Sequence, residues 1–309
     1  MSATSASSGR AATADSRTAR WAAVVVSYNY GDLLERCVRS ILDECSAGEP
    51  DVVVVDNGST DGSIERLSSA LPQARIFSAP GNVGYARGAN IGIATTDAPV
   101  VAVLNGDVEL VPGVGAAMVA AIDTDPRVGA VGPRVLNLDG SIYPSARTDP
   151  GLGVAAAHGA LGLVWPTNPW TRRYRQLDRD PTTARHVDWV SGAAVWLRRE
   201  ALDDVGGWDE RYFMYMEDVD LCLRLRRAGW RIAYEPLGAV VHTQGASTSQ
   251  RPYRMIAEHH RSVWRFASRR YRAWRRALLV PLAVVLALRC VAAMAQHAWG
   301  RPSTPRVTG

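Results

Sequence analysis

The stretch DVVVVDNGSTDG, residues 51–62, decides the fold. Four consecutive valines are typical of a strand that is buried on both faces of a parallel sheet. The glycine-rich acidic turn at 56–62 is the kind of loop that ends such a strand. Residues 64–71 then show helical spacing. The stretch therefore predicts a strand, a turn and a helix that belong to an α/β fold.

The same alternation continues on both sides of this stretch. Short apolar runs at 22–27, 74–79 and 100–104 predict three more strands, and helical spacing at 33–42 and 86–94 predicts helices between them. Strands separated by helices at this pace indicate a mostly parallel central sheet with helices on both faces. The predicted fold class is α/β, with a Rossmann-like sheet.

A polar cluster follows each of four predicted strands. The clusters are 27–29 (SYN), 56–62 (DNGSTDG), 82–85 (NVGY) and 105–107 (NGD). In an open parallel sheet the ligand crevice lies beyond the carboxyl ends of the strands. Asn-Gly and Asp-Gly are also ordinary turn formers, which explains any one cluster. Four clusters in succession favour a binding edge.

The standard glycine-rich phosphate loops are missing. All 35 basic residues other than histidine are arginine, so a P-loop, which needs lysine, is excluded. Residues 151–156 match G-x-G-x-x-A, but no predicted strand precedes them, which disfavours a dinucleotide-binding fold. A site that lacks these loops and still acts on a substrate with a diphosphate leaving group needs another source of positive charge, and the usual one is a divalent cation held by carboxylates. Asp107 and, two residues earlier, Asn105 are the candidate ligands; a plain turn is the alternative.

A second candidate site lies in residues 206–224. A double glycine and an aromatic segment (212–215, YFMY) precede a helix predicted at 217–228, which places Glu217 and Asp218 at its N-terminus. Acidic residues are common there because of the helix dipole, but an aromatic wall that excludes water favours a general base. His242 follows an apolar stretch at 239–241 and is either structural or a further metal ligand.

Together these motifs resemble the inverting family 2 glycosyltransferases of GT-A fold. The resemblance rests on 24–29 (VVVSYN), 56–62, 82–90 (NVGYARGAN), 105–107 and 207–224, and spans about residues 22–250. It implies nucleotide-sugar binding by Ser27, Asn29, Asp56, Asn57, Asn82, Gly84, Asn90, Asn105 and Asp107. It also implies Mg²⁺ or Mn²⁺ on Asp107 and His242, and Asp218 as catalytic base with Glu217 beside it. Asn105 departs from the family, since many members have Asp there.

Three further segments resemble the rhamnosyltransferases within this family. They are 140–147 (GSIYPSAR), 165–176 (WPTNPWTRRYRQ) and 212–221 (YFMYMEDVDL). The resemblance implies dTDP-L-rhamnose as donor, the 3-OH of GlcNAc-diphospho-decaprenol as acceptor and inversion in a single displacement. Another donor or acceptor remains the alternative. The candidate acceptor-binding residues are Arg147, Arg172, Arg173, Trp189, Gly192 and Arg224.

The C-terminal end of the chain is strongly basic. Residues 259–309 contain ten arginines and no Asp or Glu, whereas residues 1–258 hold 25 arginines and 30 acidic residues. Arginines alternate with aromatic residues at 261–276, ahead of an apolar run at 277–288 that Pro281 interrupts and Arg289 closes. That run is shorter than the about 20 residues of a membrane span. It predicts an amphipathic helix on an anionic membrane surface; a helix packed on the domain is the alternative.

The predicted organisation has three parts. Residues 1–20 form a disordered tail without the apolar run of a secretory signal, residues 21–250 form the glycosyltransferase domain, and residues 251–309 form the basic helical segment. The expected location is the cytoplasmic face of the plasma membrane, without nucleic acid as a partner. Four cysteines without metal-site spacing disfavour a disulfide framework or structural zinc. A pyrophosphorylase would need lysine near the phosphates, whereas a non-catalytic sugar-binding scaffold stays open.

Overall fold

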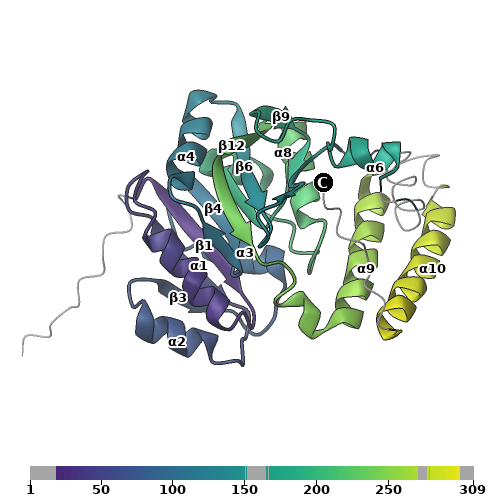
Figure 1. Ribbon diagram of the computed structural model, residues 1–309, viewed down its shortest axis with the longest axis horizontal. Helices are drawn as coiled ribbons and strands as arrows, with labels where there is room; N and C mark the ends of the chain where they lie inside the picture. The colour runs from purple at the N-terminus through teal and green to yellow at the C-terminus, as the bar shows by residue number, and fades with distance from the viewer. Residues whose placement is uncertain are drawn as a thin grey trace, which may run out of the picture.

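The computed structural model describes residues 19–149, 151, 165, 167–270, 277 and 279–299. Within them a ten-stranded sheet forms the centre of the molecule, in the order β3-β2-β1-β4-β11-β6-β12-β5, with β7 paired to β6 and β9 paired to β12 (Figure 1). The predicted α/β class with a mostly parallel central sheet is confirmed.

The first half of the chain forms the parallel part of the sheet. Its elements are β1 (Trp21–Ser27), α1 (Asp32–Leu42), β2 (Asp51–Asp56), α2 (Ser63–Ala70), β3 (Arg75–Ser78), α3 (Tyr85–Ile93) and β4 (Val100–Asn105). Strand β1 pairs in parallel with β2 and β4, and β2 pairs in parallel with β3. Each of these elements matches one predicted from the sequence to within a residue or two.

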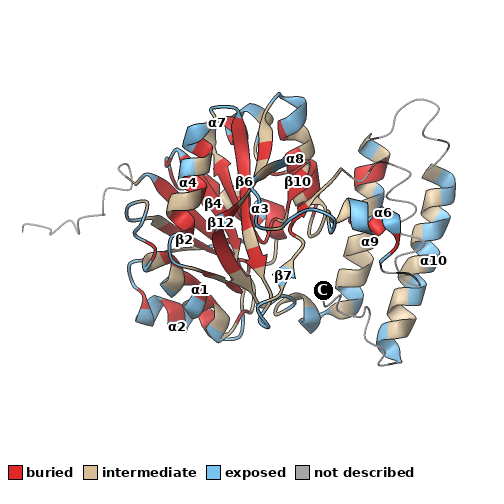
Figure 2. Ribbon diagram, turned by 45° about the horizontal axis from the view of Figure 1, so that its top comes forward, coloured by how far each residue is buried: buried red, intermediate tan, exposed pale blue. Residues whose placement is uncertain are grey.

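The valine runs are buried on both faces because side chains alternate along a strand. Val53 and Val55 of β2 lie in one apolar cluster with α3, while Val52 and Val54 lie in a second cluster with α1. Figure 2 shows these strands as a continuous buried layer between the helices. A run that alternated with polar residues would have left one face of β2 in water.

The second half of the chain completes the sheet with mixed strand directions. Its elements are β5 (Val108–Leu110), α4 (Val114–Thr124), β6 (Val128–Leu136), β7 (Ile142–Tyr143), β8 (Ala146–Arg147), α6 (Pro169–Tyr174), β9 (Arg185–Val187), β10 (Trp189–Val190), β11 (Ala194–Arg198), α7 (Arg199–Val205), α8 (Glu217–Arg227) and β12 (Arg231–His242). Strand β11 runs antiparallel to β4 and β6, and β5 runs antiparallel to β12. These pairings bring β12 to the turn between β4 and β5.

Two long helices follow the sheet, and the first packs on the domain. Helix α9 (Pro252–Arg270) follows the short 3-10 helix η2 (Thr248–Gln250) and buries Ser262, Phe266 and Ala267. The Ser262 hydroxyl donates to the Met214 carbonyl at 2.9 Å, and Arg269 pairs with Asp209 at 2.7 Å. The predicted helical C-terminal extension is confirmed, and its first half has the packed position that the sequence left as an alternative.

The second helix, α10 (Leu279–Ala298), lies beside α9 at the edge of the molecule (Figures 1 and 2). By length and composition it could cross a membrane, and none of its residues is buried against the described part of the protein. The prediction of an apolar stretch too short to span is therefore wrong for the helix as a whole. Pro281 falls in its first turn, where a missing N–H leaves no helical hydrogen bond unmade, so the helix continues.

Some predicted features lie outside the described residues. They are the N-terminal tail over 1–18, most of the 151–164 segment, and Arg272, Arg275 and Arg276 of the basic segment.

Candidate active site

The four polar clusters that follow the predicted strands meet at one edge of the sheet. Ser27 stands beside Asp56, Asp56 stands beside Ser78, and Asn105 stands beside Val26 in the strand registers. This follows from parallel pairing, which brings the carboxyl ends of neighbouring strands to the same side. The edge therefore carries the residues that the sequence singled out.

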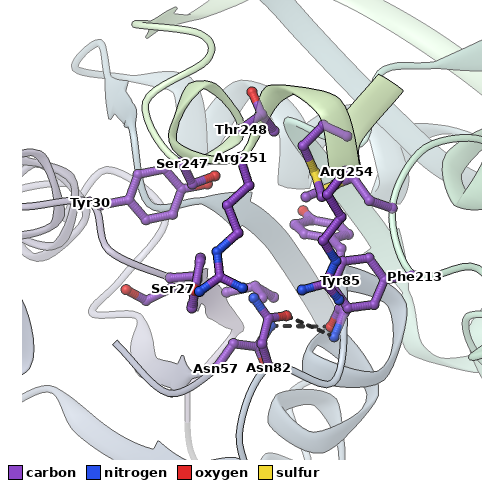
Figure 3. Close-up of a pocket in the computed structure, with 15 residues that line it drawn as sticks. Ser27, Tyr30, Asn57, Asn82, Tyr85, Phe213, Ser247, Thr248, Arg251 and Arg254 are labelled. Carbon is purple, nitrogen blue, oxygen red and sulfur yellow. Dashed lines mark hydrogen bonds between the residues drawn. The ribbon is translucent and has the colours of Figure 1, made fainter. Parts of the chain in front are cut away.

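A pocket opens at this edge (Figure 3). On the sheet side it is lined by residues that include Ser27, Asn57, Asn82, Gly84 and Tyr85. On the other side it is lined by Phe213 and Met214, which precede α8, and by Ser247, Thr248, Arg251, Arg254 and Met255, which follow β12.

Two buried polar atoms in this pocket have no hydrogen-bond partner among the described residues. They are Oγ of Ser27, whose side chain is 0% exposed, and Oδ1 of Asn57, a residue that is 3% exposed. Buried polar groups in proteins are almost always paired, because an unmade hydrogen bond is costly. Both atoms therefore have unused hydrogen-bonding capacity next to the pocket.

The loop at 82–85 approaches the aromatic segment too closely for any side chain at position 84. Gly84 has φ +90°, and a Cβ there would lie 2.6 Å from the Phe213 carbonyl oxygen. Its carbonyl accepts from Asn57 Nδ2 at 3.2 Å, and its N–H donates to Asn82 Oδ1 at 3.2 Å. Asn57 and Asn82 thus hold the loop that forms the pocket wall.

Three other predicted nucleotide-sugar residues stabilise loops and are not among the residues that line the pocket. Asp56 Oδ1 accepts from the Ser59 N–H at 2.8 Å, and Asn29 Oδ1 accepts from the Thr60 N–H at 2.7 Å. The Asn90 amide bonds both the N–H and the carbonyl of Trp208, each at 2.9 Å. Asn90 therefore ties α3 to the segment before α8.

The turn between β4 and β5 brings Asn105, Asp107 and His242 together. His242, at the end of β12, is opposite Val108, and its Nε2 lies 3.1 Å from Asp107 Oδ1 and 3.4 Å from Asn105 Nδ2. Asp107 is only 3% exposed, and Nδ1 of His242 is buried without a partner in the described part of the chain. The sequence left the position of His242 open, and only the β5–β12 pairing places it here.

These residues can supply few protein ligands to a metal. Among the described residues no group of three or more His, Cys, Asp or Glu side chains surrounds a metal position. Asp107 and His242 nevertheless present an oxygen and a nitrogen to one point, with the Asn105 amide beside them. Mg²⁺ is usually bound through one or two carboxylates together with substrate phosphates, so this donor set fits a cation that a diphosphate completes.

Asp218 is fixed by backbone hydrogen bonds near the start of α8. Its Oδ2 accepts from the Gly192 N–H at 2.9 Å, and its Oδ1 accepts from the Val219 N–H at 2.8 Å. Burial raises the pKa of Asp218, although these hydrogen bonds and the charge of Arg147 act in the opposite direction. A raised carboxyl pKa brings the group closer to that of a useful base.

Glu217 is buried beside Asp218. It is 6% exposed, and its Oε2 has no hydrogen-bond partner within the described residues. Burial, and then the charge of Asp218, raise the pKa of Glu217 well above its ordinary value. Placing two adjacent carboxyl groups away from water destabilises the fold. Such clusters of groups with shifted pKa values are typical of functional sites.

Tyr85 connects the pocket to Asp218. It lines the pocket, and its hydroxyl donates to the Gly192 carbonyl at 2.6 Å, while the Gly192 N–H holds Asp218. Burial raises the pKa of Tyr85, and the negative charges of Glu217, Asp218 and Asp107 raise it further. The charges of the candidate base, Asp218, and of the candidate metal ligand, Asp107, therefore both raise the pKa of Tyr85.

Arg147, whose charge acts on Asp218, is surrounded by aromatic rings. Its guanidinium stands over the rings of Trp189 at 4.9 Å, Tyr143 at 5.5 Å and Tyr174 at 5.7 Å, and it donates to the Tyr143 hydroxyl at 2.7 Å. Its charge also lowers the pKa of Asp218. Trp189 is buried and donates its own N–H to the Thr148 carbonyl at 3.0 Å.

Two predicted acceptor residues have contacts of a different kind. Arg224 pairs with Asp220 at 2.7 Å and donates to the carbonyls of Val205 at 2.9 Å and Gly207 at 2.8 Å, so it fastens the double-glycine turn to α8 instead of facing an acceptor. Gly192 bonds Asp218. Arg172 and Arg173 are exposed on α6.

The sequence missed the pocket residues that follow β12. Arg251 and Arg254 lie beyond the predicted end of the domain at residue 250, yet they line the pocket that the strand ends form. The spacing of three residues at a helix start was the one available signal, since it places both side chains on one face. The pattern of apolar residues that predicts the sheet does not indicate that Arg251 and Arg254 lie at the pocket.

Comparison with known proteins agrees with this geometry. The model of the family "Glycosyl transferase family 2" matches residues 22–206, and that of "Glycosyl transferase family group 2" matches 176–302. The N-acetylglucosaminyl-diphospho-decaprenol L-rhamnosyltransferase of Mycobacterium tuberculosis is 41% identical over 267 residues, which are 83% of this chain and 86% of that protein. A pre-mycofactocin glycosyltransferase of the same organism is 32% identical over 62% of this chain and 37% of its own.

Solved glycosyltransferase structures share the fold. A crystal structure of GalNAc-T7 with UDP, GalNAc and Mn²⁺ superposes with a TM-score of 0.54 at 18% identity, over 74% of this chain and 44% of that one. The structure of Staphylococcus aureus TarS 1–349 gives a TM-score of 0.51 at 14% identity, over 88% and 72%. With the family match covering more than half of the chain, this protein belongs to glycosyl transferase family 2 and is a glycosyltransferase of GT-A fold.

Proposed function

We propose that the protein transfers L-rhamnose from dTDP-β-L-rhamnose to the 3-OH of a GlcNAc-diphospho-polyprenol, with inversion at the anomeric carbon. The 41% identity over most of both chains to a relative named for that transfer supports the substrates. The observation that carries the reaction type is the connection from the pocket through Tyr85 and Gly192 to Asp218.

The donor binds in the pocket at the strand ends. The unpartnered Oγ of Ser27 and Oδ1 of Asn57 form hydrogen bonds with the nucleotide portion of the donor. Gly84 lets this wall of the pocket pack closely against Phe213. Asp56 and Asn29 act by holding the loops around this wall. Because these groups are fixed before the donor arrives, little ordering opposes binding.

Asp107 and His242 would hold Mg²⁺ or Mn²⁺ together with the donor's diphosphate. The ion would supply positive charge to the departing nucleoside diphosphate. Asn105 supplies an amide where a second carboxylate would add charge, so the protein contributes less negative charge to the ion. The shared position of Asp107 and His242 supports this assignment.

Asp218 acts as the general base. A carboxylate oxygen of Asp218 takes the proton from the acceptor hydroxyl, and that oxygen attacks the anomeric carbon from the face opposite the diphosphate. The raised pKa of Asp218 favours proton transfer, and Gly192 fixes the carboxylate without neutralising it. Glu217 packs behind it as an orienting neighbour.

The acceptor approaches over Arg147 and the rings around it. A guanidinium can bond a lipid diphosphate bidentately, and the stacked rings of Tyr174 and Trp189 hold it in place. Arg172 and Arg173 on α6 are exposed and add positive charge to the same part of the chain. An anionic membrane surface at the cytoplasmic face of the plasma membrane would be the partner of α10 and the basic segment.

A donor panel tests this proposal. The purified full chain is incubated with synthetic GlcNAc-diphosphoryl-prenol and each of several dTDP-, UDP- and GDP-sugars, and the linkage of any product is read by NMR. We expect α-L-rhamnosyl-(1→3)-GlcNAc from dTDP-L-rhamnose alone. Transfer of another sugar would show that the proposed donor is wrong, while the assignment to the glycosyltransferase family would stand. Binding of dTDP without any transfer would favour a non-catalytic scaffold.

A further inference from the structure

We propose that Arg251 and Arg254, at the start of α9, bind the diphosphate of the nucleotide-sugar donor, so that the C-terminal helical segment completes the donor site. This inference rests on the proposed function, because it takes a nucleoside diphosphate sugar as the ligand of the pocket. It adds two binding residues from a part of the chain that the sequence separated from the catalytic domain.

Both arginines reach into the donor pocket from the side opposite the strand ends. Figure 3 shows their guanidinium groups extending towards Asn57 and Asn82 on the sheet side of the pocket. The buried Ser27 Oγ and Asn57 Oδ1, which lack partners among the described residues, line the same space. Two cations and two unpaired polar atoms thus surround one volume.

The two arginines have no acidic partner in the described part of the chain, unlike Arg261, Arg269 and Arg270 of α9. Arg261 pairs with Glu258 at 2.7 Å, Arg269 pairs with Asp209 at 2.7 Å, and Arg270 pairs with Asp149. Among the described residues, the one ring contact of this pair is that of Arg254, whose guanidinium lies 4.5 Å from the centre of the Phe213 ring. A pair of uncompensated guanidinium groups facing one pocket favours an anion.

The ligand chemistry that fits is a diphosphate. Guanidinium groups bond phosphate oxygens bidentately, and charge-assisted hydrogen bonds of this kind are among the stronger ones in proteins. Arg254 lies in the first turn of α9 and Arg251 directly before it, and a helix N-terminus favours negative charge. Gly106, which directly precedes Asp107, packs against Tyr30 of this pocket, since a Cβ at Gly106 would lie 2.5 Å from the Tyr30 ring.

The experiment compares nucleotide binding by the full chain and by R251Q and R254Q. Affinities for dTDP, dTMP and thymidine are measured by calorimetry and ligand-observed NMR, with EDTA present so that arginines are the cations tested. We expect each variant to lose about tenfold or more in affinity for dTDP, with the affinity for thymidine unchanged. R261Q is the matched control on the same helix, because Arg261 is exposed and outside the pocket.

The outcomes are distinct. Wild-type affinity for dTDP in both variants, or an equal loss for dTDP and thymidine, would overturn the inference. Binding of UDP and not dTDP, with the same loss in the variants, would refute the thymidine donor while the role of the arginines stands. No nucleotide binding by the wild-type chain, either in EDTA or with Mg²⁺ or Mn²⁺ added, would overturn both proposals. R251K and R254K, which keep the charge and lose the fork of donors, should recover part of the lost affinity.

Discussion

The Gly192 N–H donates a 2.9 Å hydrogen bond to Asp218 Oδ2, and a Cβ at position 192 would lie 3.1 Å from Asp218 Cβ. The loop before β11 and the first turn of α8 therefore meet so closely that a methyl group at position 192 would require Asp218 or its neighbours to shift by a few tenths of an ångström. Because Tyr85 bonds the carbonyl of the same glycine at 2.6 Å, the donor pocket and the base share one fixed residue.

We predict that Gly192→Ala lowers kcat by about ten- to a hundredfold, because small misplacements of a catalytic group are costly. Affinity for the donor nucleotide should change little. Gly151→Ala is the matched control, since no described residue lies within 4 Å of a Cβ at that position. Steady-state kinetics of both variants checks this, and equal kcat values in the two would contradict it.

Asp218→Asn should abolish base catalysis while it preserves donor binding. We expect kcat to fall by about two to four orders of magnitude, the usual contribution of a general base, with an unchanged Kd for dTDP. In the wild type, kcat/KM should rise with pH through the raised pKa of Asp218, above the ordinary value of 3.8, because only the ionised form accepts a proton. Turnover by the variant equal to that of wild type would remove Asp218 from this role.

Glu217 should make the protein less stable as pH rises. Its pKa is raised in the folded state, so protonated Glu217 is tolerated at low pH, and stability is lost as pH rises from the ordinary 4.5 through the raised value. The melting temperature of Glu217→Gln relative to wild type should therefore increase with pH across that window. Thermal unfolding at a series of pH values measures this, and a difference independent of pH would refute it.

Removal of the His242 imidazole should lower the affinity of the active site for the divalent metal. For His242→Gln we expect the Mg²⁺ or Mn²⁺ concentration for half-maximal activity to rise by about tenfold or more, as for lost metal-site groups in general. His186→Gln is the control, because His186 is 57% exposed and lies beside Asp125 instead. Activity that EDTA does not reduce in the wild type would show that the Asp107–His242 pair serves another purpose.

Deletion of residues 279–309 should detach the protein from membranes and leave its site intact. Helix α10 has no buried residues in the described structure, whereas α9 supplies pocket residues and must be kept. Sedimentation with anionic liposomes should be lost, and dTDP binding should persist. Attachment of the full chain that resists high salt would indicate that the apolar helix dominates over the arginines.

The parallel half of the fold was predictable because its signals are local. Runs such as 51–56 identify a doubly buried strand, and helical spacing between the runs leaves few topologies. The antiparallel insertion of β11 between β4 and β6 was not predictable, since its pairing joins residues that are distant in the chain. The full length of α10 was not predictable either, because the effect of Pro281 depends on its position in the helix, which the sequence leaves open.

By itself the sequence determined which residue types end the strands, and therefore that a polar edge with Asp107 exists; it also determined that Glu217 and Asp218 start a helix. Only the tertiary structure decided which of them act together. The β5–β12 pairing places His242 on Asp107, Gly192 holds Asp218, and α9 brings Arg251 and Arg254 to the pocket. The physical reason is that strand and helix formation depend on neighbours in the chain, whereas a site depends on packing between segments far apart in it.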